Sequence, residues 1–579
     1  MANIKNKLIN FFKTPYEPRM IVLAVIVGII GGLGAVLFHY LILLFKYIFY
    51  GATSTDTFLD TVRMLPWYHR LLAPAIGGLI VGPMVTYIVQ EARGHGVPEV
   101  IEALVFKKGT IRFRVAPLKA LISAICIGSG GSAGREGPIV QIGASFGSSL
   151  GNYLELSPEK VKTLLGAGAA AGIAGTFNAP LAGVVFSMEV LLKKFELGNF
   201  SPLVVAAVTG TAVANILFGD AEPIFMIPEH QLVNYVELIF YMGLGILGGV
   251  IAIIYGNSLY SMEHLFEKIP VPEASKAAIG GLLLGVLALA VPQIYATGYP
   301  VMESALYGRL PLQTVFLLIF AKILATILTL GSGGSGGIFA PSLYIGAMLG
   351  SAYGMIVHSA FPTITAGATS YAMVGMGTVF AGATHAPLTA IIIIFEMTQD
   401  PLIILPLMFA CKFSSFIAKQ VQEKNIYSTK LLNRGIDIET IEGRNVLGTV
   451  KTKEIMTTDV KTVTRDTTII EAKQLFEKTL FNYLPVVNKE TDELLGVLNF
   501  NDLMGHLDLD CDGPCHVEDV MITPFIKISE EKSLLKALKL IEDNEVDLVP
   551  IVSEDNPDEL VGLLTKSDIL KAYHHWELA

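Results

Sequence analysis

Two charged residues, Arg135 and Glu136, stand side by side in a glycine-rich stretch, GSGGSAGREGPIVQIGASFG (128–147), with apolar sequence before and after it. A second stretch, GSGGSGGIFAPSLYIGAMLG (331–350), repeats this frame without the charges. In both stretches glycines precede a proline, and proline is tolerated in the first turn of a helix. Each stretch therefore predicts a helix start, where unpaired backbone N–H groups and a partial positive charge of about 0.5 are available to an anion.

A third helix start is predicted by RGHGVPEVIEAL (93–104), where Gly94, Gly96 and Pro98 precede an apolar run. At about 4 Å and an effective dielectric constant near 20, one helix start attracts a monovalent anion by about 2 kcal/mol. Three converging starts would therefore offset much of the dehydration of a chloride ion. A cation site would instead need several carboxylates and carbonyl groups. The pattern indicates an anion site built from backbone dipoles.

Glu136 has a specific chemistry at such a site, because its carboxylate carries the same charge as the anion. When deprotonated it can occupy the backbone amides and block the path, and when protonated or displaced it can swing away. One residue would then couple anion occupancy to proton uptake. The alternative is a structural pair of Arg135 and Glu136 at a helix start, where a glutamate is ordinarily stabilising.

The elements that position these residues must lie in a membrane. Of the 579 residues, 52% are hydrophobic and 16% are charged, whereas soluble domains contain about a quarter charged residues. Apolar runs long enough to approach a membrane span recur along the chain. Lys5, Lys7, Lys13 and Arg19 precede the first run without a cleavage-site pattern, which predicts a cytoplasmic N-terminus. We expect a multi-pass protein of the plasma or inner membrane.

The membrane part is predicted to be a duplication. Pro138 and Pro341 are 203 residues apart, and the same offset pairs the surrounding glycines of both stretches. A second pair of blocks, FNAPLAGVVFSMEV (177–190) and THAPLTAIIIIFEM (384–397), follows in the same order. Such halves often have opposite topology, with the substrate site where broken helices from both halves meet. Recurrence for helix packing alone is the simpler alternative.

The composition changes near residue 440, after which we count 14 basic and 27 acidic residues, a net charge of −13 against −10 for the whole chain. This acidic tail is predicted to be soluble and cytoplasmic, without nucleic-acid binding. It is also doubled, since LPVVN (484–488) recurs as VPIVS (549–553) about 65 residues later. The sequence CDGPCH contains Cys511, Cys515 and His516, but a zinc site would need further ligands. We expect free thiols there and no metal site.

The membrane motifs GREGP, GGIFAP, GHGVPE, the two APL blocks and EKNIYS (423–428) together resemble the CLC family of chloride channels and proton-coupled chloride transporters. The resemblance implies an all-α membrane domain of two inverted repeats and a homodimer with chloride and protons as its ions. It implies that Glu136 is the gate. The anion ligands it implies lie at backbone amides around Gly137, Ile338 and Phe339 and at the hydroxyl of Tyr427.

Two residues depart from the family pattern. His95 stands where the central motif usually has a serine hydroxyl, and either its ring N–H donates to the anion or the ring turns aside and leaves only backbone amides. Val190 stands where proton-coupled members often have a relay glutamate, as it does in passive channels. Chloride/proton exchange and passive chloride conduction therefore both remain open.

The tail resembles a pair of CBS domains, which often bind adenine nucleotides. In that pattern a Ser or Thr and an Asp contact the ribose. Thr565 and Asp568 match in the second repeat, whereas the first repeat has Asp502 but Asn499 in place of the hydroxyl residue. A nucleotide site and a purely structural or dimerising tail are both compatible with these residues, and no cofactor is required for transport.

These observations predict a domain order and exclude several functions. A fluoride exporter of the same family is less favoured, because only the central motif differs. A CBS-regulated cation transporter would need acidic clusters in the membrane part, and the sequence has none there. An enzyme would need a nucleophile–base pair or a phosphate loop, and the sequence shows neither. The predicted segments are an N-terminal segment 1–19, a membrane domain 20–430 (repeats about 70–220 and 235–430), a linker 431–448, and CBS units 449–508 and 516–575.

Overall fold

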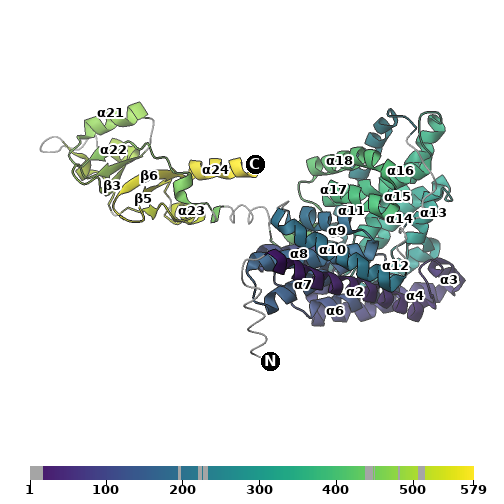
Figure 1. Ribbon diagram of the computed structural model, residues 1–579. Helices are drawn as coiled ribbons and strands as arrows, with labels where there is room; N and C mark the ends of the chain where they lie inside the picture. The colour runs from purple at the N-terminus through teal and green to yellow at the C-terminus, as the bar shows by residue number, and fades with distance from the viewer. Residues whose placement is uncertain are drawn as a thin grey trace, which may run out of the picture. The chain divides into compact units, whose positions relative to one another are not determined.

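The computed structural model describes residues 17–193, 197–219, 225, 233–436, 447–448, 450–479, 483–505, 515–523, 525–544 and 546–578. The chain forms two compact units, residues 1–436 and 437–579 (Figure 1). Most of the predicted N-terminal segment, much of the predicted linker and Cys511 lie outside the described residues.

In the described residues of the first unit, every named element is a helix. Its helices are α2 (Glu17–Tyr50), α3 (Phe58–Met64), α4 (Trp67–Pro83), α5 (Val97–Phe106), α6 (Val115–Gly128), α7 (Glu136–Tyr153), α8 (Pro158–Phe177), α9 (Pro180–Phe186), α10 (Leu197–Phe218), α11 (Glu237–Lys268), α12 (Glu273–Ala290), α13 (Tyr299–Leu306), α14 (Leu312–Gly331), α15 (Phe339–Ala360), α16 (Ala368–Thr384), α17 (Pro387–Thr398), α18 (Ile404–Val421) and α19 (Ile426–Asn433). Short 3-10 or π segments are η1 (Met84–Ile88), η2 (Gln90–Ala92), η3 (Ser187–Leu192), η4 (Pro292–Ile294) and η5 (Pro401–Ile403).

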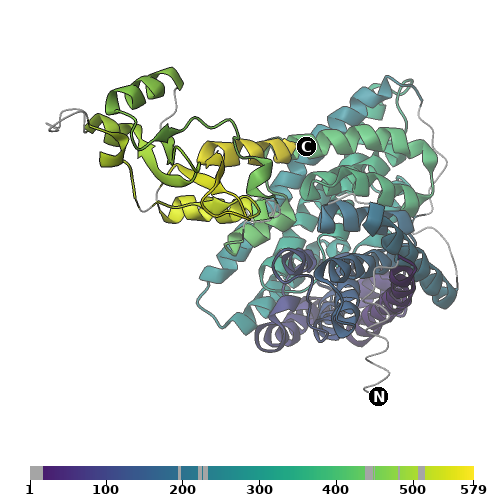
Figure 2. The same cartoon turned by 60° about the vertical axis from the view of Figure 1, so that its left-hand side comes forward.

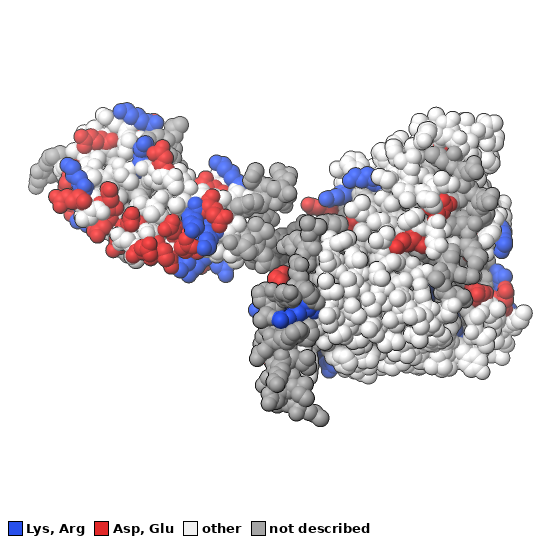
Figure 3. Space-filling model, in the orientation of Figure 1, with Lys and Arg blue, Asp and Glu red and all other residues white. Residues whose placement is uncertain are grey.

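Within the described residues, eight helical stretches are long and apolar enough to cross a membrane. The face of this unit shown in Figure 3 is almost entirely uncharged, as a lipid-facing surface requires. Other helices are too short to cross: α5 has 10 residues, about 15 Å, against a hydrocarbon core of about 30 Å. The predicted all-α multi-pass membrane domain is confirmed.

Small residues allow the helices of each half to approach closely. A Cβ atom at Gly143 of α7 would lie 2.1 Å from the carbonyl oxygen of Gly168 in α8. The equivalent helices of the second half, α15 and α16, repeat this contact, since a Cβ at Gly346 would lie 2.2 Å from the carbonyl oxygen of Gly375. Helix association in lipid depends on such close packing of backbones.

The two halves contact each other reciprocally. Gly134 and Gly337 occupy equivalent positions, 203 residues apart. The N–H of Gly134 donates to the carbonyl of Gly337 at 2.7 Å, and the N–H of Gly337 donates to the carbonyl of Gly134 at 2.6 Å, in an antiparallel bridge. A residue that pairs with its own equivalent in both directions lies beside a twofold axis. The duplication therefore has local twofold symmetry at this point.

A second reciprocal contact involves the two FNAPLAG-type blocks. Glu189 of the first half accepts a hydrogen bond from the N–H of Thr389, at the start of α17, at 2.7 Å. Glu396 of the second half accepts one from the N–H of Ala182, at the start of α9, also at 2.7 Å. Each half thus supplies a carboxylate to a helix start of the other, where negative charge is stabilising. These bonds agree with a structural role for Glu189.

The second unit contains two copies of one small α/β motif, as Figure 2 shows from a turned view. Each copy has a three-stranded sheet, β1-β2-β3 and β4-β5-β6, in which the first pair is parallel and the second antiparallel. Its elements are α21 (Ile469–Thr479), α22 (Phe500–Gly505), α23 (Leu534–Asp543), α24 (Lys566–Leu578), η6 (Thr452–Glu454), η7 (Val517–Asp519), β1 (Val463–Thr464), β2 (Tyr483–Val487), β3 (Leu494–Asn499), β4 (Ile528–Ser529), β5 (Leu548–Val552) and β6 (Leu560–Thr565). The predicted α/β tail is confirmed.

Two details of this unit concern charge and cysteine. Salt bridges from Lys451 and Lys453 lower the pKa of the exposed Glu531 carboxyl to about 2 and link the two copies.

Cys515 is in a disulfide, with its partner outside the described residues. The prediction of a free thiol at Cys515 is therefore wrong: four cysteines are too few for a disulfide framework, but a single disulfide needs only two of them.

The substitution Gly143→Ala tests the packing of α7 on α8. The added methyl group would meet backbone, which cannot rotate away, so we expect the free energy of unfolding to fall by about 3 kcal/mol. Denaturation of the purified chain in detergent micelles measures this change. In the control Gly34→Ala the Cβ would lie 3.6 Å from Ile142, an ordinary contact, and we expect no loss. Equal stability of the two variants would contradict the packing described.

Candidate functional site

Three helix starts meet in the first unit. They belong to α5, α7 and α15, which begin at Val97, Glu136 and Phe339. The loop before α5 is bonded to the loop before α15, because the N–H of Gly94 donates to the carbonyl of Gly334 at 3.0 Å. The loops before α7 and α15 are joined by the reciprocal glycine bridge described above. The predicted convergence of the three starts is therefore present.

Glycine is required where the first two loops touch. A Cβ atom at Gly137 would lie 2.0 Å from the carbonyl oxygen of His95. Gly96 has a φ of +84°, a conformation that favours glycine. These two glycines let the start of α5 approach the first turn of α7 with backbone against backbone. The unpaired N–H groups of both helices are thereby brought to one place.

A small enclosed cavity lies at this meeting point, and we call it the central cavity. It has a volume of about 10 Å³, enough for about one water molecule or small ion. The structure places all six residues of the predicted gate and anion site around it. The lining residues are His95, Val97, Glu136, Gly137, Val140, Ile173, Phe186, Ile338, Phe339 and Tyr427.

Glu136 is held at the cavity by two donors. Its side chain is buried, and Oε2 accepts a hydrogen bond from the backbone N–H of Ala340 at 3.2 Å, in the first turn of α15. Oε1 accepts a hydrogen bond from the hydroxyl of Tyr299 at 2.7 Å. The carboxylate thus takes up a helix-start amide that would otherwise be available to an anion. Tyr299 is a site residue that the sequence interpretation missed, although GYP (298–300) resembles GVP (96–98) at an offset of 202.

Arg135 bonds elsewhere than to its neighbour Glu136. One guanidinium nitrogen donates to the carbonyl oxygen of Thr176 at 3.2 Å. Another lies 3.2 Å from Nδ1 of His39, and the guanidinium carbon is 5.4 Å from the ring centre of Tyr299. The interpretation of Arg135 and Glu136 as a structural ion pair is therefore not supported by these contacts.

His95 is buried with unused hydrogen-bonding capacity. Its Nε2 is 3.4 Å from the hydroxyl of Tyr260, and that hydroxyl donates to the carbonyl of Ile426, so Tyr260 can only accept from His95. Nδ1 is buried, and it has no hydrogen-bond partner among the residues that the structure describes. A neutral ring that donates from Nε2 leaves a lone pair at Nδ1, whereas an imidazolium donates from both nitrogens.

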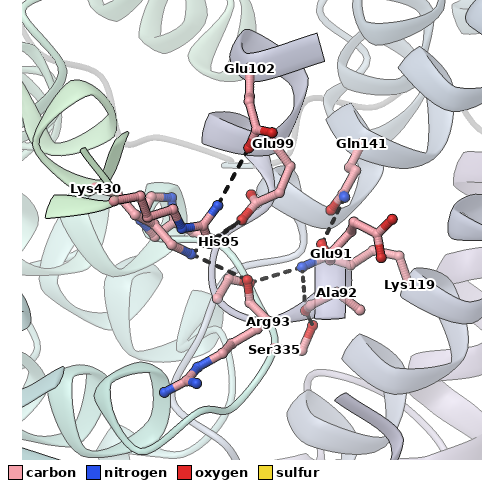
Figure 4. Close-up of polar contacts among 12 residues, drawn as sticks. Glu91, Ala92, Arg93, His95, Glu99, Glu102, Lys119, Gln141, Ser335 and Lys430 are labelled. Atoms are coloured by element: carbon pink, nitrogen blue, oxygen red, sulfur yellow. Dashed lines mark hydrogen bonds and ion pairs between the residues drawn. The ribbon is translucent and has the colours of Figure 1, made fainter. Parts of the chain in front are cut away.

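Three cations, of which Lys119 and Lys430 are buried, lie around the loop before α5 (Figure 4). The ammonium of Lys119 donates to the carbonyls of Ala92 and Gly94, each at 2.9 Å. Lys430 lies 3.4 Å from a carboxylate oxygen of Glu99 and Arg434 lies 3.0 Å from the same oxygen. Arg434 also lies 3.7 Å from a carboxylate oxygen of Glu102, so these three cations face two carboxylates and leave a small excess of positive charge. Such a surrounding favours an anion in the central cavity.

The candidate nucleotide residues lie in the second unit, apart from this site. The hydroxyl of Thr565 donates to Oδ2 of Asp568 at 2.7 Å, and the N–H of Asp568 donates back to the hydroxyl of Thr565 at 3.1 Å. Asp568 also accepts from the N–H of Thr565 at 3.1 Å. This is a reciprocal cap at the start of α24. Both residues therefore have a structural role, whatever else they bind. Asp502 lies in α22, the equivalent helix of the first copy.

In the described part of the chain, no cluster of three or more His, Cys, Asp or Glu side chains suits a metal ion.

Comparison with known proteins agrees with this architecture. Residues 77–419 match the family model described as voltage gated chloride channel, and residues 453–509 and 517–575 each match a CBS domain. The chain is 34% identical over 416 residues to a ClcB-like chloride channel protein of Ralstonia nicotianae, which covers 71% of this chain and 96% of that protein. It is 31% identical over 440 residues to the H⁺/Cl⁻ exchange transporter ClcA of Citrobacter koseri, covering 74% and 91%. The crystal structure of a slow cyanobacterial Cl⁻/H⁺ antiporter aligns with a TM-score of 0.66 and 27% identity, over 75% of this chain and 100% of that one.

The substitution His95→Phe tests whether the imidazole donates to an anion. Phenylalanine keeps a planar ring but removes the donor that an imidazolium presents at Nδ1, so for a charged ring we expect chloride affinity to fall about tenfold, the effect of one lost hydrogen bond to a charged group. Isothermal titration of the purified full-length chain with chloride measures the affinity. His95→Asn keeps a donor and should stay within about threefold of the original. Unchanged affinity in His95→Phe would show that the imidazole does not bind the ion, which leaves the backbone amides and the hydroxyl of Tyr427 as its ligands.

Proposed function

The chain belongs to the voltage-gated chloride channel family, and on that premise we propose that it moves chloride across a membrane in exchange for protons, with Glu136 as the gate. The bound anion would lie in the central cavity. Its ligands would be the backbone amides at Gly137, Ile338 and Phe339, the hydroxyl of Tyr427 and the ring of His95.

One observation carries the proposal: the carboxylate of Glu136 is bonded to a helix-start amide that an anion would otherwise use. Its bond to the N–H of Ala340 is 3.2 Å long. A helix start binds carboxylates and free anions by the same attraction. Chloride and the carboxylate therefore compete for one place, and only one of them can hold it at a time.

Protonation decides this competition. A neutral carboxylic acid is attracted to a helix start far less than a carboxylate, because the attraction acts on its charge. Proton uptake by Glu136 would therefore release the bond to Ala340 and leave the amide to chloride. Loss of the proton would return the carboxylate and expel the anion. Tyr299, which donates to Oε1, would hold the closed position.

Exchange is favoured over passive conduction by the named relatives, since a ClcA exchange transporter and a cyanobacterial antiporter both resemble this chain. Val190 favours the passive alternative. It is buried in η3 and cannot carry a proton where proton-coupled members often have a glutamate. A chloride channel without proton coupling is therefore the second candidate function.

The remaining assignments complete the proposal. The transporter would act as a homodimer in the plasma or inner membrane, with both termini in the cytoplasm. An adenine nucleotide would bind the CBS pair near Asp502, Thr565 and Asp568 and regulate transport. The composition of the pair, with 27 acidic residues after position 440, argues against nucleic acid as a partner.

The substitution Glu136→Gln tests the gate. We expect chloride flux to persist but to lose its dependence on pH between pH 4 and 8, and proton movement to fall below detection, because glutamine cannot exchange a proton. Chloride and pH electrodes on vesicles loaded with chloride measure the two fluxes. Glu267→Gln, on an exposed part of α11, should behave as the original chain. If chloride drives no proton movement in the original chain, the channel alternative holds. A fluoride exporter is distinguished by comparing fluoride efflux with chloride efflux in the same vesicles.

The substitution Asp568→Asn tests nucleotide binding. If Asp568 contacts a ribose, the affinity of the purified full-length chain for ATP, ADP or AMP should fall about tenfold in a calorimetric titration. Loss of a helix cap by itself costs about 1 kcal/mol of stability. Ser533→Ala removes a comparable cap, at the start of α23, and should leave nucleotide affinity unchanged. No heat of binding with the original chain would indicate a structural tail.

A further inference from the structure

Lys46, in the last part of α2, is a buried cation without an acceptor. It is 3% exposed. Among the described residues its ammonium lies 4.8 Å from the ring centre of Phe58. The carboxylate of Asp56 attracts it as well, but it forms no hydrogen bond or ion pair with a described residue. A buried charge is ordinarily paired or hydrogen-bonded, because removing it from water is costly. Lys46 therefore lacks the partner that its position requires.

Two other buried lysines of the helix-start region, at equivalent positions in the two halves, show what a structural role looks like. Lys119 donates to the carbonyls of Ala92 and Gly94 before α5. Its equivalent in the second half, Lys322, donates to the carbonyl of Ile294 at 3.1 Å and to that of Ala296 at 2.8 Å, before α13. Both lysines are satisfied by backbone. Lys46 has no equivalent carbonyl pair, so a structural role of that kind does not account for it.

Lys46 lines a separate cavity, which we call the Lys46 cavity. Its volume is about 20 Å³, enough for one water molecule or one small ion. Gln293 also lines it, and Oε1 of Gln293 is buried without a partner in the described part of the chain; as an acceptor, this oxygen does not itself bind an anion. The lining residues are Lys46, Thr55, Phe58, Leu59, Gln293, Tyr295, Ala296, Thr297, Gly298, Pro300 and Val301. The cavity is too small for a phosphate headgroup with its chain.

The start of α13 also lies at this cavity. Gly298 precedes the helix with a φ of +84°, the value that Gly96 has before α5, and Pro300 stands in the first turn as Pro98 does in α5. The two helix starts are thus equivalent parts of the two halves. One of them contributes to the central cavity. The other presents the same partial positive charge to the Lys46 cavity.

Tyr299 connects the two cavities. Its hydroxyl donates to Oε1 of Glu136, which lines the central cavity, and its chain neighbours Gly298 and Pro300 line the Lys46 cavity. Arg135 stacks on the same tyrosine ring, with 5.4 Å between its guanidinium carbon and the ring centre. The gate residue is therefore one side chain away from the second cavity.

We propose that the Lys46 cavity is an additional binding site for a monovalent anion, next to the Glu136 gate. In the proposed function this anion is chloride, which would bind there before it reaches the central cavity. The ammonium of Lys46 and the start of α13 would bind the ion together. The inference rests on the proposed function for the identity of the ion. The site itself rests on the unpaired ammonium and the cavity around it.

The substitution Lys46→Gln tests the kinetic role of this site. We expect the chloride concentration that gives half-maximal flux in vesicles to rise about tenfold, the effect of one lost charged hydrogen-bond donor. Lys46→Arg keeps the charge and should stay within about threefold. Lys268→Gln, at the exposed end of α11, should leave the value unchanged. An unchanged half-maximal concentration in Lys46→Gln would overturn the proposal.

A second measurement remains decisive if Lys46→Gln fails to fold. Crystals of the full-length original chain grown in sodium bromide should show an anomalous bromide peak between Lys46 and Gly298, separate from any peak beside Tyr427. A peak in the central cavity alone would refute the Lys46 site and leave the proposed function intact. Absence of chloride flux in the original chain would refute the proposed function instead, and a bromide peak at Lys46 would then still establish the anion site.

Discussion

The structure depends on unpaired backbone N–H groups held inside a membrane protein. In hydrocarbon such groups are costly, so they persist only where protein surrounds them and where an anion or a carboxylate satisfies them. The helices must therefore break and restart within the membrane unit, and their starts must be held together by direct backbone bonds. The bridge between Gly134 and Gly337 does this, and it is short because neither residue has a side chain. The site is made of main chain first and of side chains second.

Buried cations are arranged around this framework in a consistent way. Lys119 and Lys322 each fix the loop before a helix start by binding two of its carbonyl oxygens. Lys430 and Arg434 are balanced in part by Glu99. Lys46 stands out from all of them because it remains unpaired, and that difference distinguishes a binding group from a supporting one.

The sequence predicts the framework better than it predicts the contacts. Glycines followed by proline locate the helix starts near Glu136 and Phe339, because backbone conformation depends mainly on local residue types. The offset of 203 residues reveals the duplication for the same reason. The partners of Glu136 could not be predicted, since Tyr299 approaches it from 163 residues away. The orientation of His95 is likewise determined by Tyr260, which comes from another helix.

The exchange of carboxylates between Glu189 and Glu396 has an evolutionary consequence. Each half offers a glutamate to the other and accepts one in return, so the contact is self-complementary and would work equally well between two separate polypeptides. A half on its own would have a helix start without a carboxylate to accept from its N–H groups, and a glutamate without a helix start to bind. An ancestral half-length subunit could therefore have paired with a second copy of itself, antiparallel in the bilayer. Gene fusion would then have preserved the pairing, after which the two copies were free to diverge, one acquiring Glu136 and the other keeping Phe339 in the corresponding loop.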